Sequence, residues 1–355
     1  MSKRPPKSGL AGTAPQPISL ALQGGGAWGA FTWGVLDHLL TRDSLAIDQI
    51  SGTSAGAING AIVCSALAHG RPSEACQALE SFWRSVAEHP ARSLLQTLMG
   101  PIGELMTKRV NNWMLGAGSV SPYQTDPLDW NPMRAAISAH VDIEAIRSRT
   151  GPQLFVTATN VRTGLPRVFG SAEITLDSLA ASACLPQIFR AVQINGEAYW
   201  DGGYCGNPTL WPLVRHGKAN DIVLVQLAPE RRDEVPRDTA GIRDRAAEIV
   251  FNSSLVAEMQ AIHAIREMAS SAGSRSAFLQ TRFHRIGPPP DAVLSESGAA
   301  TDRSWQWLTQ LRDEGRVAAR RFMARNRSKL GVESTLDIAK VFFDHHKPMV
   351  NLQLS

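Results

Sequence analysis

The stretch Ile18-Ser-Leu-Ala-Leu-Gln23-Gly24-Gly25-Gly26-Ala-Trp28-Gly29 decides the predicted fold. Its first six residues are typical of a buried strand, and the glycine run follows them without a break. Residues 30–40 then carry apolar side chains at helical spacing. The glycines are therefore predicted to form the turn between a strand and a helix.

A second unit of the same kind follows. Residues 46–50 predict a short strand, Ser51-Gly52-Thr-Ser54-Ala-Gly56 a turn, and residues 57–67 a buried helix of small side chains. Two such units in succession are typical of an α/β fold with parallel strands. We expect a mostly parallel central sheet flanked by helices in three layers, with further strands at 154–158 and 222–227, a helix at 176–184, and a hairpin at 192–200 turning at Asn195-Gly196.

The sequence divides into segments of different composition. The predicted segments are a Pro-rich disordered arm (1–17), the main α/β domain (18–227) with a helical insertion or cover (73–149), a charged linker (228–240), and a mainly helical C-terminal extension (241–355) with a strand-like stretch at 280–286. Two stretches each allow two interpretations. Residues 94–115 are typical either of an amphipathic helical cover or of a mobile lid. The basic residues of 310–329 are typical either of a solvated helix face or of a surface attracted to an anionic membrane.

Composition excludes several classes of protein. Hydrophobic residues are 43% and charged residues 19% of the 355, as in soluble globular proteins. Three of the net +4 charges lie in the arm, at Lys3, Arg4 and Lys7, so no basic face for nucleic acid is expected. The four cysteines lack zinc spacing, so we expect no metal. With neither a secretory signal nor a long apolar run, we expect a cytoplasmic protein.

The motif Gly52-Thr-Ser54-Ala-Gly56 matches the G-x-S-x-G nucleophile elbow and lies between a predicted strand and a predicted helix, as that motif requires. A serine at such a sharp turn is strained, and only glycine fits the crowded positions two before and two after it. Ser54 is therefore the candidate nucleophile.

The first glycine run also fits G-x-G-x-x-G, through Gly24, Gly26 and Gly29. A dinucleotide site would need an acidic residue at the end of the second strand, which here ends in Ser51-Gly52. A P-loop would need a following Gly-Lys-Ser/Thr, which is also missing. The alternative is an oxyanion hole built from backbone N–H groups, with Gly25 and Gly26 as the preferred donors.

Asp201-Gly202-Gly203 follows the predicted hairpin. A serine nucleophile needs a base, and none of the nine histidines lies in a motif that nominates it. Ser54, Asp201 and His216 have the residue types of a catalytic triad and are one candidate set, because a triad is defined by its geometry and not by the order of its members in the chain. The other interpretation of Asp201 is structural, as a turn aspartate that caps the glycines after it.

The three motifs, in this order and with Ala181-Ser-Ala-Cys-Leu-Pro186 before the last, resemble the patatin-like phospholipase family over residues 18–227. The resemblance implies an α/β-hydrolase-related fold, hydrolysis of lipid acyl esters without a cofactor, Ser54 as nucleophile, Asp201 as general base and no catalytic histidine. It also implies an oxyanion hole at Gly24, Gly25 and Gly26, supported by the motif glycines Gly29, Gly52, Gly56, Gly202 and Gly203.

One departure from the family is Trp28, at a position where many members carry Lys or Arg. This residue leaves phospholipids and neutral esters equally open as substrates, and simple packing of the turn is its alternative role. Other functions with the same motifs are an acyltransferase, an intracellular polyester depolymerase, or a non-catalytic lipid-binding protein at a membrane. The expected partner is a lipid or ester, with peripheral membrane contact as an alternative; the oligomeric state is left open.

Overall fold

The computed structural model describes residues 16–42, 45–88, 121–125, 132–228, 232, 234–273, 276–288 and 303–343. The predicted cover or lid at 94–115 lies outside these residues, as do 1–15 of the predicted arm and part of the linker. Among the described helices, none is both long and apolar enough to cross a membrane.

The described strands form one mixed sheet in the order β5-β6-β3-β2-β1-β7-β8, with β4 paired to β3. Strands β1, β2, β3, β7 and β8 run parallel, whereas β4, β5 and β6 are antiparallel to their neighbours. The strands are β1 (Gln16–Leu22), β2 (Leu45–Thr53), β3 (Gln153–Asn160), β4 (Pro166–Gly170), β5 (Val192–Ile194), β6 (Glu197–Asp201), β7 (Asp221–Val225) and β8 (Arg282–Ile286). The expected mostly parallel sheet is confirmed.

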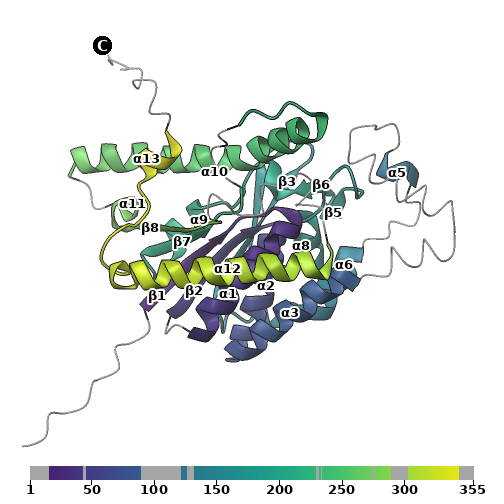
Figure 1. Ribbon diagram of the computed structural model, residues 1–355, viewed down its shortest axis with the longest axis horizontal. Coiled ribbons are helices and arrows are strands. Elements are labelled where there is room, and N and C mark those ends of the chain that lie inside the picture. The colour runs from purple at the N-terminus through teal and green to yellow at the C-terminus, as the bar shows by residue number, and fades with distance from the viewer. Residues whose placement is uncertain are drawn as a thin grey trace, which may run out of the picture.

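Helices cover both faces of this sheet (Figure 1). On one face α1, α2, α3 and α12 pack with Leu20 and Leu22 of β1, and on the other face α9, α10 and α13 pack with Ala21. Neighbouring residues of one strand therefore enter opposite cores, as the alternation of side chains along a strand requires. The helices are α1 (Gly29–Arg42), α2 (Ala55–Ala68), α3 (Pro72–Glu88), α5 (Pro122–Thr125), α6 (Pro132–His140), α7 (Ile143–Arg147), α8 (Leu176–Ser182), α9 (Trp211–His216), α10 (Thr239–Ser271), α11 (Ala277–Gln280), α12 (Trp305–Asn326) and α13 (Ile338–Phe342).

The C-terminal region shares the sheet and the core of the rest of the chain. The strand-like stretch predicted at 280–286 forms β8, which pairs in parallel with β7 along five residues. Helix α12 packs so closely on α1 that a side chain at Gly315 would meet the carbonyl of Phe31. One face of α12 is buried, and Arg316, one of the basic residues of this helix, pairs with Asp37 of α1.

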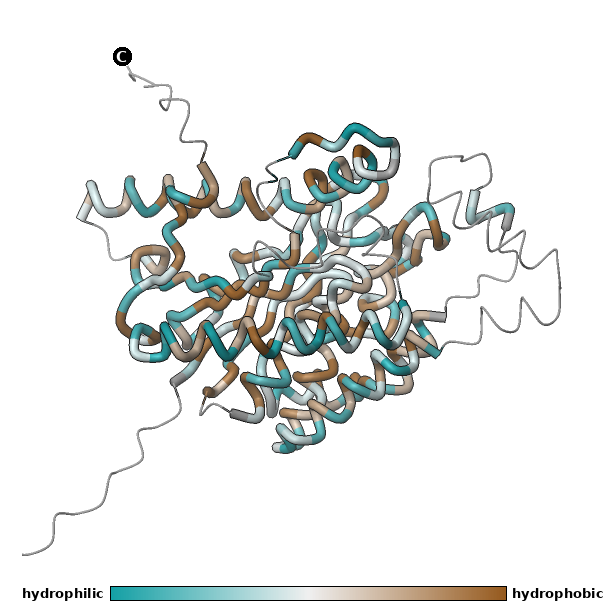
Figure 2. The backbone as a smooth tube through the Cα atoms, in the orientation of Figure 1, coloured by the Kyte–Doolittle hydropathy of each residue, from teal (hydrophilic) through white to brown (hydrophobic). Residues whose placement is uncertain are grey.

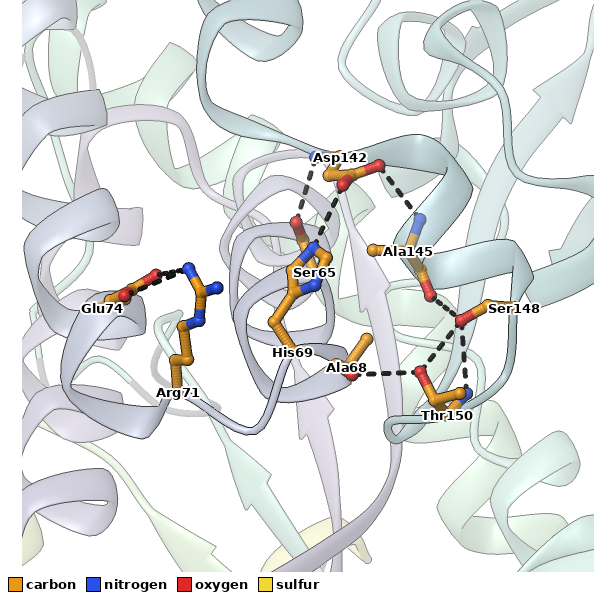
Figure 3. Close-up of polar contacts among 9 residues, drawn as sticks. All are labelled: Ser65, Ala68, His69, Arg71, Glu74, Asp142, Ala145, Ser148 and Thr150. Atoms are coloured by element: carbon orange, nitrogen blue, oxygen red, sulfur yellow. Dashed lines mark hydrogen bonds and ion pairs between the residues drawn. The ribbon is translucent and has the colours of Figure 1, made fainter.

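A polar network holds the far end of α2 (Figure 3). Asp142 caps α7 by accepting the N–H of Ala145 at 3.0 Å, and its other oxygen lies 3.1 Å from His69 Nε2. Its own N–H donates to Ser65 Oγ of α2. The N–H of Ala145, and then His69, hold the pKa of Asp142 below its usual value. The network fixes the helix whose opposite end carries Ser54.

Candidate active site

Ser54 lies at the sharp turn between β2 and α2, with φ 53° and ψ −125°. A positive φ is strained for a residue with a side chain, so the surrounding packing must hold this conformation. The flanking glycines make that packing fit: a side chain at Gly52 would lie 2.6 Å from the carbonyl of Gly56, and one at Gly56 would collide with the carbonyl of Leu22. The chain therefore adopts the elbow that the motif predicts.

Asp201, the last residue of β6, lies directly opposite Ser54. The Ser54 hydroxyl donates to Asp201 Oδ2 at 2.7 Å, and the N–H of Gly203 donates to Asp201 Oδ1, also at 2.7 Å. Pairing of β6 with β3 sets the Asp201 backbone beside Ala158, while its N–H donates to the carbonyl of Cys184. The two predicted catalytic residues, 147 positions apart in sequence, are thus in direct contact.

The carboxyl group of Asp201 is fully buried. Burial raises its pKa from 3.8 to about 7, although the bonds from Gly203 and Ser54 act in the opposite direction. A carboxylate with such a pKa is a far better proton acceptor near neutral pH than an exposed aspartate.

The glycines after Asp201 permit this arrangement by their lack of side chains. A Cβ at Gly202 would collide with the carbonyl of Thr157 in β3, and one at Gly203 would collide with the ring of Phe251 in α10. Both motif glycines are therefore needed for β6 and the short turn 202–204 to approach β3 and α10.

The first glycine run lies over the nucleophile. A Cβ at Gly24 would be 2.6 Å from the carbonyl of Thr53 and 2.7 Å from the Cβ of Ser54. Gly26 has φ 58°, a left-handed conformation that glycine adopts without strain. Gly29 touches the other side of the elbow, because a Cβ there would be 2.5 Å from that of Ala55.

The three predicted oxyanion donors are not equivalent. The N–H of Gly24 donates to Asn207 Oδ1 at 2.6 Å, so it is already used within the protein. The N–H groups of Gly25 and Gly26 donate to none of the described residues. The geometry thus favours Gly25 and Gly26 as donors, with Gly24 as the residue that anchors the loop.

Two residues that the motifs did not nominate complete the site. Asn207 accepts from Gly24 and donates to the carbonyls of Gly24 and Phe251, so it ties the glycine loop to α10. Ser182 accepts the N–H of Ser54 at 3.0 Å and donates to the carbonyl of Thr157 at 2.6 Å. Ser182 belongs to the stretch 181–186 already noted in the sequence, whereas Asn207 had no such signal.

Trp28 packs into the core beside the loop with 8% of its surface exposed. Its ring approaches within 3.3 Å of a Cβ placed at Gly25. The indole N–H is buried and has no hydrogen-bond partner among the described residues. The position of Trp28 therefore fits packing of the turn, one of the two roles considered for it.

The candidate triad does not assemble. His216 is exposed at the end of α9 and stacks on Phe155, with ring centroids 6.0 Å apart. Within the described ranges, no histidine hydrogen-bonds to Ser54 or Asp201. Nor do those ranges contain a group of three or more His, Cys, Asp or Glu side chains placed to hold a metal ion.

The chain was compared with solved structures, with curated proteins and with family models. Among solved structures, the chain is similar to VipD from Legionella pneumophila, with 13% identity and a TM-score of 0.42 over 88% of this chain and 67% of that one. A search of curated proteins gave no match. The family model of the patatin-like phospholipases matches residues 20–214, more than half of the chain. The chain therefore belongs to the patatin-like phospholipase family, whose members are lipid acyl hydrolases.

Proposed function

We propose that this protein hydrolyses acyl esters of lipids through a Ser54–Asp201 dyad and an acyl-enzyme intermediate. The observation that carries the proposal is the 2.7 Å hydrogen bond from the Ser54 hydroxyl to Asp201 Oδ2, at an elbow with positive φ. A serine hydroxyl needs an adjacent base to act as a nucleophile, and Asp201 fills that position without a histidine.

In the first half of the reaction, Ser54 Oγ attacks the ester carbonyl carbon while its proton passes to Asp201 Oδ2. The tetrahedral intermediate carries a negative oxygen, which the N–H groups of Gly25 and Gly26 would stabilise. The bond to the alcohol oxygen then breaks, and the proton on Asp201 passes to that oxygen. The products of this half are a free alcohol and an acyl group on Ser54.

In the second half, water attacks the acyl carbon and gives a proton to Asp201. The intermediate collapses, Ser54 Oγ leaves and recovers the proton from Asp201, and the fatty acid is released. Asp201 thus serves as base and as acid in turn, which suits a pKa of about 7. The buried Ser182 holds the backbone of Ser54, so the nucleophile stays in line with Asp201 through both halves.

The test is covalent labelling with a fluorophosphonate probe, followed by intact mass. We expect one adduct on the wild-type protein and none on Ser54→Ala. The matched control is Ser65→Ala, because Ser65 lies on α2, the helix that follows Ser54, and has nearly the same exposure, 7% against 8%. Labelling of Ser54→Ala, or loss of labelling in Ser65→Ala with wild-type folding, would contradict the proposal.

The same acyl-enzyme could pass its acyl group to an alcohol or cleave a polyester. Hydrolysis predicts free fatty acid as the main product from a panel of lipid esters, even when an acceptor alcohol is added. Transfer to the alcohol as the main product, or turnover of polyester alone, would replace lipid hydrolysis while keeping the dyad. Vesicle binding without turnover of any ester would remove the catalytic proposal itself.

A further inference from the structure

One face of helix α10 contacts both loops of the candidate active site. In Figure 1 α10 is the long green helix at the upper edge, and Figure 2 shows hydrophilic and hydrophobic residues mixed along it. Its contacts reach the segments 23–24 and 203–210, at spacings that place them on one helical face, and they come from Phe251, Asn252, Ser254 and Glu258. All four residues lie beyond 20–214, the range that the family model matches.

Gln23, the residue before Gly24, makes the first connection between α10 and the glycine loop. Its side chain is fully buried, and its Nε2 donates to Asn252 Oδ1 at 2.8 Å. Its Oε1 accepts the N–H groups of residues 227 and 228, at 2.7 and 2.9 Å. An amide that is bonded at both ends in the interior is held in one orientation. The backbone that enters Gly24 is therefore fixed between α10 and the end of β7.

Asn207 makes the second connection. Its backbone N–H donates to Ser254 Oγ at 3.1 Å, and its side-chain nitrogen donates to the carbonyl of Phe251, also at 3.1 Å. The same side chain accepts the N–H of Gly24 at 2.6 Å. Ser254 and Phe251 thereby set the position from which Asn207 holds the glycine loop.

The same helix also contacts the turn that follows the base. The ring of Phe251 packs against Gly203, and it lies edge-on to the ring of Tyr204 with centroids 5.3 Å apart. Gly203 is the residue whose N–H donates to Asp201 Oδ1. Because one helix contacts both the glycine loop and this turn, it fixes their positions relative to each other.

We propose that Asn252 and Ser254 are positioning residues for the oxyanion hole. They act through Gln23 and Asn207, and hold the loop 24–26 where its N–H groups meet the negative oxygen of the reacting ester. The proposal rests on the hydrolysis of acyl esters proposed above. A small displacement of an oxyanion donor weakens stabilisation of the transition state and lowers the rate. The working active site then extends beyond the range of the family match.

The first test compares two serine-to-alanine changes at neighbouring positions of α10. Ser254→Ala removes the acceptor of the Asn207 N–H, whereas Ser253→Ala makes the same change at an exposed residue whose hydroxyl donates to the carbonyl of Val250 in the same helix. With p-nitrophenyl butyrate as substrate, we expect kcat/KM to fall about fivefold in Ser254→Ala, the factor that one neutral hydrogen bond is worth. Ser253→Ala should keep the wild-type value. Ser254→Thr retains the hydroxyl and should restore most of the loss.

The second measurement separates positioning from a merely structural role. The probe is an alkyl trifluoromethyl ketone: Ser54 Oγ adds to its carbonyl carbon, the Ser54 proton passes to Asp201, and the carbonyl oxygen becomes negative. Because this adduct resembles the transition state, its inhibition constant should rise in Ser254→Ala by the same factor by which kcat/KM falls. A residue that only stabilised the fold would lower the free energy of unfolding in urea and leave this constant unchanged.

Asn252→Leu extends the test to the first connection. Leucine is similar in shape but cannot accept from Gln23, and the bond from Asn252 to the carbonyl of Ala228 is lost as well. We expect kcat/KM to fall about 30-fold, since more than one hydrogen bond is removed, and the inhibition constant of the ketone to rise equally. If Asn252→Leu does not fold, the serine variants still decide the question, because each changes a single hydroxyl.

Two results would overturn the proposal. The first is a wild-type kcat/KM and inhibition constant in Ser254→Ala. The second is an equal loss in Ser254→Ala and Ser253→Ala, which would reflect a general effect on α10 instead of the bond to Asn207. A wild-type protein that neither hydrolyses esters nor takes up the fluorophosphonate probe would refute the proposed function itself, and this result is seen before any variant is made.

Discussion

Replacing Asp201 with asparagine is expected to stabilise the fold while it abolishes ester hydrolysis. The wild-type carboxylate has no exposed surface, and burial raises its pKa from 3.8 to about 7. This difference of about three pKa units corresponds to about 4 kcal/mol of unfavourable free energy in the folded state when the group is ionised. Asparagine has the same shape, can accept from Gly203, and carries no charge.

The effect depends on pH in a defined direction. Below pH 3.8 the group is neutral in both the folded and the unfolded chain, so its ionisation does not affect stability. As pH rises from there to about 7, the unfolded chain releases a proton that the folded chain keeps, and the wild type loses stability. Above about 7 the loss is complete. The advantage of Asp201→Asn should therefore grow across this window and then stay constant.

The assay is urea denaturation of both proteins at about pH 4 and about pH 9. The free energy of unfolding of Asp201→Asn should exceed that of the wild type by up to about 4 kcal/mol at the higher pH and by much less at the lower. Asp142→Asn is the control of opposite sign, because the pKa of Asp142 is lowered and its charge stabilises the fold at high pH. Equal stability of Asp201→Asn and wild type at the higher pH would refute the reasoning.

Three further predictions concern the same site. Initial labelling and hydrolysis rates should rise with pH through about 7, since Asp201 must be ionised to accept a proton; a flat profile would argue against it as the base. Asn207→Ala should lower kcat by about 10²-fold in steady-state assays, because the glycine loop loses the anchor at Gly24; unchanged kcat would remove that positioning role. Gly56→Ala should lower the unfolding free energy by about 3 kcal/mol, owing to collision with β1, whereas Gly170→Ala should behave as wild type in the same urea titration.

The elements around the motifs were predictable because local chemistry fixes them. The strand, glycine turn and helix at each of the two first units follow from apolar spacing and from positions that only glycine tolerates. The hairpin turn at Asn195-Gly196 is also confirmed, with positive φ at both residues, as a two-residue turn of this type requires. The Ser54–Asp201 pair could be nominated because both residues belong to motifs, although no spacing in the sequence gives their distance.

The features that could not be predicted depend on contacts between residues that are far apart in the sequence or on pairing between strands. Nothing in the sequence around Asn207 indicates that its side chain accepts the N–H of Gly24, 183 positions away. This bond leaves the Gly24 N–H unable to serve as an oxyanion donor. The short strand β4 was not predicted either, since only one of its five residues is buried and it pairs only with β3. Predicting a strand-like stretch at 280–286 did not reveal that residues 282–286 extend the same sheet as the motifs.

That last pairing affects the order in which the molecule can fold during synthesis. The family match ends at residue 214, but β1 pairs with β7 at 221–225, and β7 with β8 at 282–286. A nascent chain that has emerged only as far as residue 214 would expose the N–H and C=O groups of β1 along a bare edge, which invites association with other chains. The sheet that carries Ser54 is completed only after all of α10 has been synthesised, because β8 follows that helix in the chain. A fragment cut at the family boundary is therefore expected to aggregate instead of retaining the site.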